Sequence, residues 1–255
     1  MTCLNPVRAY FGPGAVGWHE TPSTPDSGYL PCNRCAGCRA RQAMDWATRC
    51  WCESRLHDQN AFVTLTYRDA PPEIVRRDLT LFFKRLRSSG VKFRYFASAE
   101  RGALYGRPHF HVLFFGVDFL TLKDRKALDA AWPHGFIDVG DVSTASVNYV
   151  AGYTAKKLAD DTADGWITMS RAPGIGYDWL RLHRFDLERT GTVVIEGKEY
   201  PIPDFFLERS ASLFRHVKKD RASYAVANQK SDTALRARAV KLEQKRREKV
   251  LGGRT

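Results

Sequence analysis

The sequence predicts an α+β fold in which a central antiparallel sheet packs against helices on one or both faces. Three observations predict it. Short runs of β-branched and aromatic residues alternate with longer runs of helix-forming residues. Two of the short runs, residues 92–100 and 109–115, are joined by a short connection with glycines, as in a hairpin. The apolar fraction of 44% supplies enough side chains for a core.

The elements follow in order along the chain. Residues 1–31 are rich in glycine, proline, serine and threonine, so we expect mostly loop. Residues 39–57, 73–88, 120–132 and 143–158 are predicted helices, and residues 61–67, 92–100, 109–115 and 134–139 are predicted strands. Residues 160–176 are polar and glycine-rich, which predicts a loop, and residues 192–200 have the pattern of a hairpin. Residues 231–250 are charged and helix-forming.

This order predicts three parts. A cysteine-rich segment with one helix covers residues 1–57, a core covers residues 58–160, and a C-terminal extension with a basic helical tail covers residues 161–255. No internal repeat is visible. No apolar run of 18 residues exists, and residues 1–10 lack the apolar stretch of a signal peptide, so we expect neither a membrane span nor secretion.

The charge of the chain favours a polyanionic partner. Forty Lys and Arg outnumber 28 Asp and Glu, which gives a net charge of +12, and nucleic acid is the simplest partner for such an excess. From residue 215 to the end there are thirteen basic against four acidic residues. This end is either a solvated helix and tail or an arm that binds a polyanion, and the two interpretations are compatible.

The six cysteines all lie in the first fifth of the chain. Without a secretion signal, such clustering indicates a metal site or free thiols and disfavours disulfides. Cys32, Cys35 and Cys38 form two overlapping C-x-x-C pairs, the spacing that brings thiolates onto one Zn²⁺. Cys3 is a candidate for the fourth ligand, in competition with three others, Cys50, Cys52 and His57. An iron–sulfur cluster and a metal-free cysteine-rich turn remain alternatives.

A second candidate metal site lies in the strand of residues 109–115. Side chains alternate along a strand, so His109 and His111 point to one face and Phe110 to the other. Glu100 ends the strand that precedes this one in the hairpin, so its carboxylate can converge with the two imidazoles. Such a set suits Mg²⁺ or Mn²⁺, with phosphate oxygens completing the shell. The alternative is two hydrogen-bonded histidines and a surface carboxylate.

The helix of residues 143–158 carries two tyrosines. Tyr149 and Tyr153 are four residues apart and therefore stack on one face, and Lys156 and Lys157 follow one turn later. A tyrosine hydroxyl is a nucleophile for phosphoryl transfer when a lysine and a metal on the phosphate stabilise the charge. The alternative is ordinary helix packing.

Three motifs in this order resemble a known family. They are the strand of residues 62–66 (FVTLT), the RPHFHVLFFG run of residues 107–116 with Glu100 before it, and the YVAGYTAKK run of residues 149–157. Together they resemble the HUH endonucleases that initiate rolling-circle replication, and most closely the initiators of microvirid phages in the gokushovirus branch. The cysteine stretch and the helix after it are also similar to that branch. The resemblance covers roughly residues 1–160.

The resemblance implies a fold, an activity and a site. The fold would be an HUH endonuclease-like sheet, with a nuclease core at residues 58–160 and the tyrosine helix over the metal face. The activity would be nicking of one origin strand, with Tyr153 or Tyr149 as nucleophile, Lys156 as charge stabiliser, and Mg²⁺ or Mn²⁺ on Glu100, His109 and His111. A 5′-phosphotyrosyl bond would form, and the displaced strand would later be religated.

One departure from the family concerns the first tyrosine. The family often has lysine immediately before the second tyrosine, where this chain has Gly152. Tyr149 therefore lacks a lysine three residues on, whereas Tyr153 has Lys156 there, which favours Tyr153 as the first nucleophile. A helical glycine also costs about 1 kcal/mol relative to alanine.

The resemblance also implies partners and a location. The partners would be origin DNA, single-stranded DNA, and the host replication helicase and polymerase, with no membrane, in the host bacterial cytoplasm. The basic surface would hold the DNA backbone, and bases near the nick would stack on exposed aromatic residues such as Trp51, Tyr67 or Tyr105.

Two other functions stay open on the residues alone. One is a non-enzymatic nucleic-acid-binding protein with a structural Zn²⁺ on the cysteines and histidines that only pack. The other is a His-x-His oxygenase, which needs a third ligand from later in the chain, where His134 and His183 are the candidates.

Overall fold

The computed structural model describes residues 3, 6–12, 15–17, 19, 21, 26–102, 105–157, 165–211 and 213–214. Of residues 11, 12, 15–17, 26–28 and 153–157 it describes the backbone only. Residues 42–209 form one compact unit, and residues up to 41 belong to a second one. The predicted basic tail of residues 215–255 lies outside the described residues.

The larger unit is built on a five-stranded antiparallel sheet with strand order β7-β4-β6-β5-β8. The strands are β4 (Asn60–Tyr67), β5 (Arg94–Arg101), β6 (Pro108–Phe115), β7 (Gly135–Gly140) and β8 (Trp166–Met169). The helices are α1 (Ala36–Ser54), α2 (Arg76–Ser88), α3 (Leu122–Ala131), α4 (Thr144–Lys157), α5 (Tyr177–Thr190) and α6 (Asp204–Arg209). The predicted α+β class with a central antiparallel sheet is confirmed.

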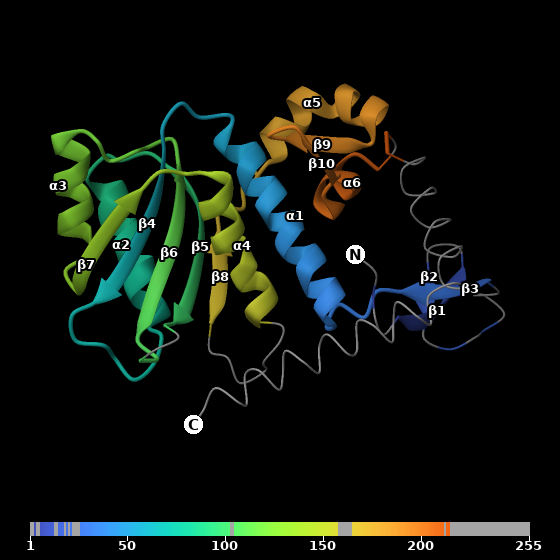
Figure 1. Ribbon diagram of the computed structural model, residues 1–255, viewed down its shortest axis with the longest axis horizontal. Coiled ribbons are helices and arrows are strands. Elements are labelled where there is room, and N and C mark those ends of the chain that lie inside the picture. Colours follow the sequence, from blue (N-terminus) through green and yellow to red (C-terminus); the bar gives the residue numbers. More distant parts are fainter. Residues whose placement is uncertain are drawn as a thin grey trace. The chain divides into compact units, whose positions relative to one another are not determined.

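Alternation along the strands divides the core into two layers. In β4 every second side chain is buried from Ala61 to Tyr67, and these side chains join the apolar residues of α2 and α3 in one cluster. The opposite face packs its upper part on apolar residues of α1 and α4. Figure 1 shows α2 and α3 behind the sheet and α4 in front of it. The period of two in the sequence therefore decides which residues lie beneath α4.

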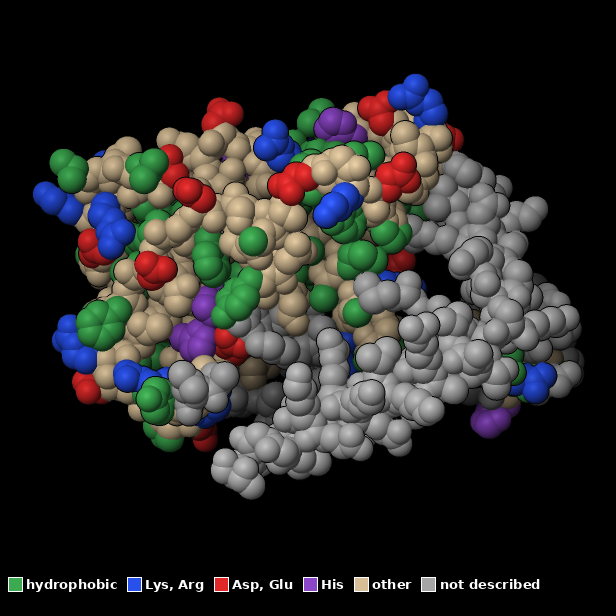
Figure 2. Space-filling view, in the orientation of Figure 1, with side chains coloured by type: hydrophobic (Ala, Val, Ile, Leu, Met, Phe, Trp, Pro, Cys, Tyr) green, Lys and Arg blue, Asp and Glu red, His purple; other side chains and the backbone are tan. Residues whose placement is uncertain are grey.

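One region of the α4 face has no helix over it (Figure 1). It spans β7 and the neighbouring parts of β4 and β6, where Phe136 and Asp138 are exposed. Figure 2 shows histidine and acidic side chains gathered at the surface in this region, with Lys and Arg side chains nearby. Gly135 makes the edge possible, because a β-carbon there would lie 2.3 Å from the carbonyl oxygen of Thr66. The face is thus sealed by α1 and α4 on one side and open on the other.

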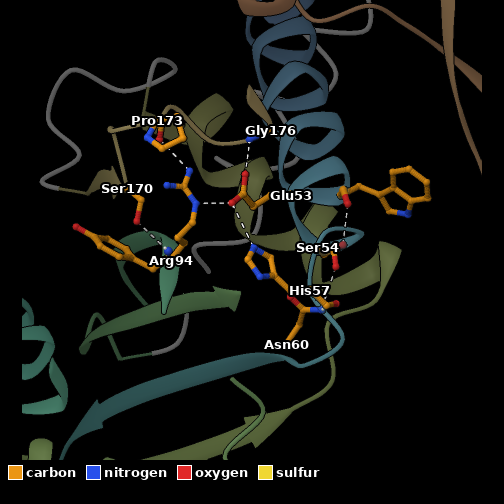
Figure 3. A network of polar contacts seen from close by, with 10 residues as sticks. Glu53, Ser54, His57, Asn60, Arg94, Ser170, Pro173 and Gly176 are labelled. Atoms are coloured by element: carbon orange, nitrogen blue, oxygen red, sulfur yellow. Dashed lines mark hydrogen bonds and ion pairs between the residues drawn. The ribbon is translucent and has the colours of Figure 1, made fainter. Parts of the chain in front are cut away.

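A buried carboxylate ties α1 to the sheet (Figure 3). Glu53 forms an ion pair with Arg94 of β5, and its other oxygen accepts the backbone N–H of Gly176 at 2.6 Å. Arg94 also donates to the carbonyl of Pro173 at 2.8 Å, and His57 lies 3.5 Å from the Glu53 carboxylate. A buried charge is tolerated when it is paired and hydrogen-bonded, so this network holds α1 beside β5.

Three expectations for the chain ends of the sheet unit needed correction or confirmation by the structure. Residues 160–176 are not all loop, because β8 pairs with β5 from Trp166 to Met169. Its polar surroundings concealed a short edge strand. The helix α5 was not predicted, since its apolar positions are few, Leu180 and Leu187 being the buried ones. The hairpin predicted at residues 192–200 is present as β9 (Thr192–Ile195) and β10 (Lys198–Pro201).

The N-terminal residues also contain more structure than expected. A three-stranded antiparallel sheet with order β2-β1-β3 is formed by β1 (Val7–Gly12), β2 (Ala15–Gly17) and β3 (Asp26–Leu30). The expected loop is wrong here because backbone pairing between distant segments outweighs the turn-forming composition. Among the described residues, every helix is too short or too polar to cross a membrane.

Candidate metal and nucleophile site

Three predicted ligands meet on the α4 face of the sheet. Glu100 lies directly opposite His109 in the β5–β6 ladder, and His109 and His111 share this face. The Nε2 atoms of His109 and His111 lie 2.8 and 3.3 Å from Oε1 of Glu100. The three ligand atoms are all within 4.8 Å of one another, as a shared ion requires. The convergence expected from the hairpin is therefore present.

The other ring nitrogens of the two histidines are also held. Nδ1 of His109 lies 3.1 Å from the carbonyl oxygen of Arg107, and since a carbonyl only accepts, Nδ1 donates the proton. Nδ1 of His111 lies 3.1 Å from the hydroxyl of Thr64, which can accept in the same way. With both Nδ1 atoms protonated, both Nε2 atoms carry lone pairs and face Glu100.

This arrangement fits a cation. Two lone pairs and a carboxylate oxygen within hydrogen-bond distance repel one another unless a positive charge lies among them. A mixed nitrogen and oxygen donor set accommodates Mn²⁺ and, with water or phosphate oxygens, Mg²⁺. The side chains of His109 and Glu100 are 15% and 14% exposed, so an ion here could still be reached by a substrate oxygen.

One of the two tyrosines is placed against this cluster. Val147, Val150 and Ala151 are buried and seat α4 on the sheet, which leaves Tyr149 49% exposed. Its ring lies 5.1 Å from that of His111. The backbone of Tyr153 and Lys156 belongs to α4, but their side chains lie outside the described part of the structure.

Several residues that the sequence did not single out support the site. Thr64 and the Arg107 carbonyl orient the imidazoles, and Phe62 stacks on His111 at 5.7 Å. The FVTLT alternation places Phe62 and Thr64 on one face, so this signal was available. What it lacked was the register, in which Thr64 lies opposite His111.

The aromatic residues expected to stack on bases differ in exposure. Tyr105 is 84% exposed. Tyr67 is buried and donates its hydroxyl to Asp78 at 2.9 Å, which removes it as a stacking surface. Burial, followed by the contact with Asp78, raises the pKa of Tyr67 above its usual value of 10.0. Trp51 is half-buried on α1.

The four predicted zinc ligands form a second cluster, in the N-terminal unit. Sγ of Cys35 lies 3.9 Å from that of Cys3, and Sγ of Cys32 lies 4.0 Å from that of Cys38. Four thiolates around Zn²⁺ with bonds of about 2.3 Å are about 3.8 Å apart. All six cysteines are free, and the four in this cluster have the spacing of a tetrahedral site.

The local backbone favours thiolates in this cluster. Burial alone raises the pKa of Cys32, but the backbone N–H groups of Arg34 and Cys35 and the neighbouring thiols outweigh it and lower the pKa to about 6. For Cys38, burial followed by the thiols of Cys3 and Cys35 raises the pKa. A cation would relieve this mutual repulsion, since a coordinating thiol is deprotonated.

The competing ligands lie elsewhere. Cys50 is buried among apolar side chains, and burial raises its pKa and that of Cys52. His57 is next to Glu53. The two candidates for an oxygenase site are also outside the Glu100 cluster: His134 packs on Trp132 and lies 3.8 Å from Asp78, and His183 stacks on Trp179.

Comparison with known proteins agrees with these motifs. Residues 60–158, which hold β4, the histidine strand and α4, match the family model of the replication-associated protein ORF2. The chain is 30% identical over 239 residues to the replication-associated protein VP4 of Bdellovibrio phage phiMH2K, covering 81% of this chain and 76% of that protein. It is 29% identical over 216 residues to the replication-associated protein ORF2 of Spiroplasma virus 4, covering 71% and 67%.

A third relative matches a smaller share. The replication-associated protein ORF4 of Chlamydia phage 1 is 28% identical over 210 residues, which is 69% of this chain and 52% of that protein. No solved structure gives a significant match. The extent of the VP4 match and the shared motif region lead to one conclusion: this chain belongs to the microvirid-like family of phage replication-associated proteins.

Proposed function

We propose that this protein initiates phage DNA replication by cutting one strand of the origin with a tyrosine, as an HUH endonuclease. The observation that carries the proposal is the ring of Tyr149 lying 5.1 Å from that of His111, at the edge of the Glu100, His109 and His111 cluster. Family membership supplies the role in replication, and the cluster with its neighbouring hydroxyl supplies the chemistry.

The proposed reaction is a phosphoryl transfer to the protein. The tyrosine oxygen attacks the scissile phosphorus, the bond from phosphorus to the 3′ oxygen breaks, and a 5′-phosphotyrosyl bond and a free 3′-OH result. That 3′-OH primes synthesis. Glu100, His109 and His111 would hold Mg²⁺ or Mn²⁺, which polarises the phosphate. Lys156 would stabilise the charge on the tyrosine oxygen. After one round, the second tyrosine attacks the regenerated origin, and the released 3′-OH displaces the first tyrosine to close the circle.

A labelling experiment tests the proposal directly. A random-sequence single-stranded DNA pool is incubated with protein and Mn²⁺, labelled at the 3′ end in one sample and the 5′ end in another. The 3′ label should migrate with denatured protein, and the 5′ label should appear on shortened free DNA. Tyr149→Phe/Tyr153→Phe should abolish the adduct. An adduct that persists in this double variant, or none with wild type, rejects the mechanism.

Single variants assign the first tyrosine. Tyr153 is the proposed first nucleophile because Lys156 follows it by three residues, so Tyr153→Phe should reduce the adduct more than Tyr149→Phe. A β-carbon at Gly152 meets no described atom within 4 Å, so Gly152→Lys fits and gives Tyr149 the same lysine spacing. That variant should raise the adduct formed by Tyr153→Phe. No change would reject the lysine argument.

The proposal extends to the cysteines and the partners. Cys3, Cys32, Cys35 and Cys38 would bind one structural Zn²⁺. The predicted basic tail would hold DNA through phosphate contacts that weaken with salt. The host helicase and polymerase would act on the nicked origin in the bacterial cytoplasm.

The cysteine cluster also favours a second candidate, a zinc-containing protein that binds nucleic acid without cutting it. It predicts salt-sensitive DNA binding that His109→Ala and His111→Ala leave unchanged, and no transfer of label to the protein.

A further inference from the structure

The open part of the α4 face carries an exposed aromatic ring next to the metal cluster. Phe136 on β7 is 61% exposed. In the sheet it lies opposite Thr66, which lies opposite His109, which in turn lies opposite Glu100. All four side chains therefore belong to one row across the sheet and point to the same face. Two strand spacings, about 10 Å, separate Phe136 from His109 along this row.

Burial gives no reason for an aromatic residue at this position. The neighbours of Phe136 on its own strand, Ile137 and Val139, point to the other face and pack on the α2 and α3 cluster. Gly135 brings β7 close to β4, as its short approach to Thr66 shows. The ring is thus held on a paired strand with much of its surface in solvent. Rigid, exposed aromatic rings are the surfaces on which unpaired bases stack.

Positive charge accompanies this ring. The guanidinium of Arg68 lies 5.7 Å from the centroid of the Phe136 ring. That of Arg107 donates to the carbonyls of Tyr67 and Arg68 at 2.6 and 2.9 Å, which fixes its position without neutralising it. Asp138, two residues along the same face, is an exposed carboxylate. A phosphate backbone passing this edge is therefore attracted on the arginine side and repelled on the Asp138 side.

We infer that Phe136, with Arg68 beside it, is a stacking platform for one nucleobase of the strand that is cut, close to the scissile phosphate. The inference rests on the proposed nicking function, because it takes the Glu100, His109 and His111 cluster as the place of the phosphate. Single-stranded DNA is the fitting occupant, since only an unpaired base presents its face to the ring while its phosphates reach the arginines.

The test measures DNA binding without metal, so it does not depend on cutting. The probe is the shortest fluorescent oligothymidylate that binds with full affinity, so that one register is available, in EDTA and low salt. Phe136→Ala should weaken binding by about tenfold, the order of one lost stack. Phe136→Tyr should bind like wild type, and Phe136→Leu, which keeps apolar bulk without a π face, should behave like Phe136→Ala.

A matched control lies on α5. Phe185 is 64% exposed and has the Arg184 guanidinium 4.7 Å from its ring centroid, so it is an equally exposed Phe–Arg pair away from the sheet face. Phe185→Ala should leave affinity unchanged. Equal losses in Phe136→Ala and Phe185→Ala would overturn the inference, because exposed aromatic residues in general would then account for binding.

Abasic substitutions locate the base. Each nucleotide of the oligomer is replaced in turn by an abasic one. At one position the loss seen with wild type should be absent with Phe136→Ala. Uniform losses in both proteins, or wild-type affinity in Phe136→Leu, would overturn the platform.

The label-transfer assay separates this outcome from the fate of the nicking proposal. Failure to form an adduct leaves the abasic pattern to be read in EDTA, whereas absence of the pattern leaves adduct formation intact.

Discussion

The two ligand clusters of this protein are built in opposite ways. Glu100, His109 and His111 stand on paired strands, and both histidines are oriented by further hydrogen bonds. The four cysteines come from residue 3 and from the turn that leads into α1, with backbone N–H groups as their main partners. The sheet positions its ligands through apolar burial, whereas the cysteine cluster depends on its own ligands.

This difference separates two uses of a metal. A site on a pre-formed sheet can exchange its ion and admit a substrate, because the fold does not depend on the ion. A closed set of four thiolates stores folding free energy in the metal bond, and the surrounding chain orders only with the ion. Metal removal and substitution at each cluster should therefore give opposite results.

Removal of zinc should have the largest effect. Structural zinc contributes about 10–16 kcal/mol in small zinc-binding peptides, so EDTA should expose the amides of β1 and β3 to hydrogen exchange. The amides of β4, β5 and β6 should keep their protection in the same sample. Hydrogen exchange measured by mass spectrometry reads both.

Zinc content checks the ligands of this site. One zinc per chain is expected in wild type and in Cys50→Ala, whose thiol lies outside the cluster, and loss of zinc in Cys32→Ser. Retained zinc in Cys32→Ser, or equal exchange in both sheets, would remove the contrast.

Loss of a sheet ligand should affect chemistry without affecting the fold. Glu100→Gln and His109→Ala should lower the rate of adduct formation by about 10³-fold, since a bound ion stabilises transition-state charge by several kcal/mol. Thermal unfolding should change little. Asp138→Asn, which removes an exposed carboxylate from the same face, should react like wild type. A large drop in unfolding temperature for Glu100→Gln would mean that this site too is structural.

Removal of an orienting hydroxyl should have a smaller effect. Thr64→Val keeps the β-branched shape but leaves Nδ1 of His111 without its partner, and such losses typically weaken metal binding by about 10- to 100-fold. Titration with Mn²⁺ measures it. Thr64→Ser should restore binding. Thr66→Val, two residues along the same face, should bind Mn²⁺ normally, and equal weakening in both variants would reject a specific role for Thr64.

The smallest effect concerns the sheet itself. The folded-state pKa of Tyr67 is raised above 10.0, so above pH 10 the folded protein holds a proton that the unfolded chain loses. Stability should therefore fall as pH rises, by at most about 1.4 kcal/mol per pH unit from this group. Urea unfolding of wild type and Tyr67→Phe between pH 9 and 11 measures it, and Tyr67→Phe should show a shallower decline. Parallel declines would contradict the assignment.

The sequence predicted much of the sheet unit because its signals are local. The alternation in residues 61–67 and the period of the two histidines state which side chains share a face. The strands of residues 7–30 and β8 escaped prediction because short edge strands depend on their partners more than on their own composition. The row from Glu100 to Phe136 required the register of four strands, and the sequence of each strand by itself does not contain it.

The hairpin that holds the histidines has a consequence for how such a chain can change over generations. Buried side chains alternate with the ligands on β6, so an insertion of one residue in this strand turns both histidines toward the α2 and α3 core at once. An insertion of two residues keeps them on their face but moves them past Glu100. The ligand pair is therefore inherited as a unit, and lineages can vary its neighbours by substitution far more readily than by length.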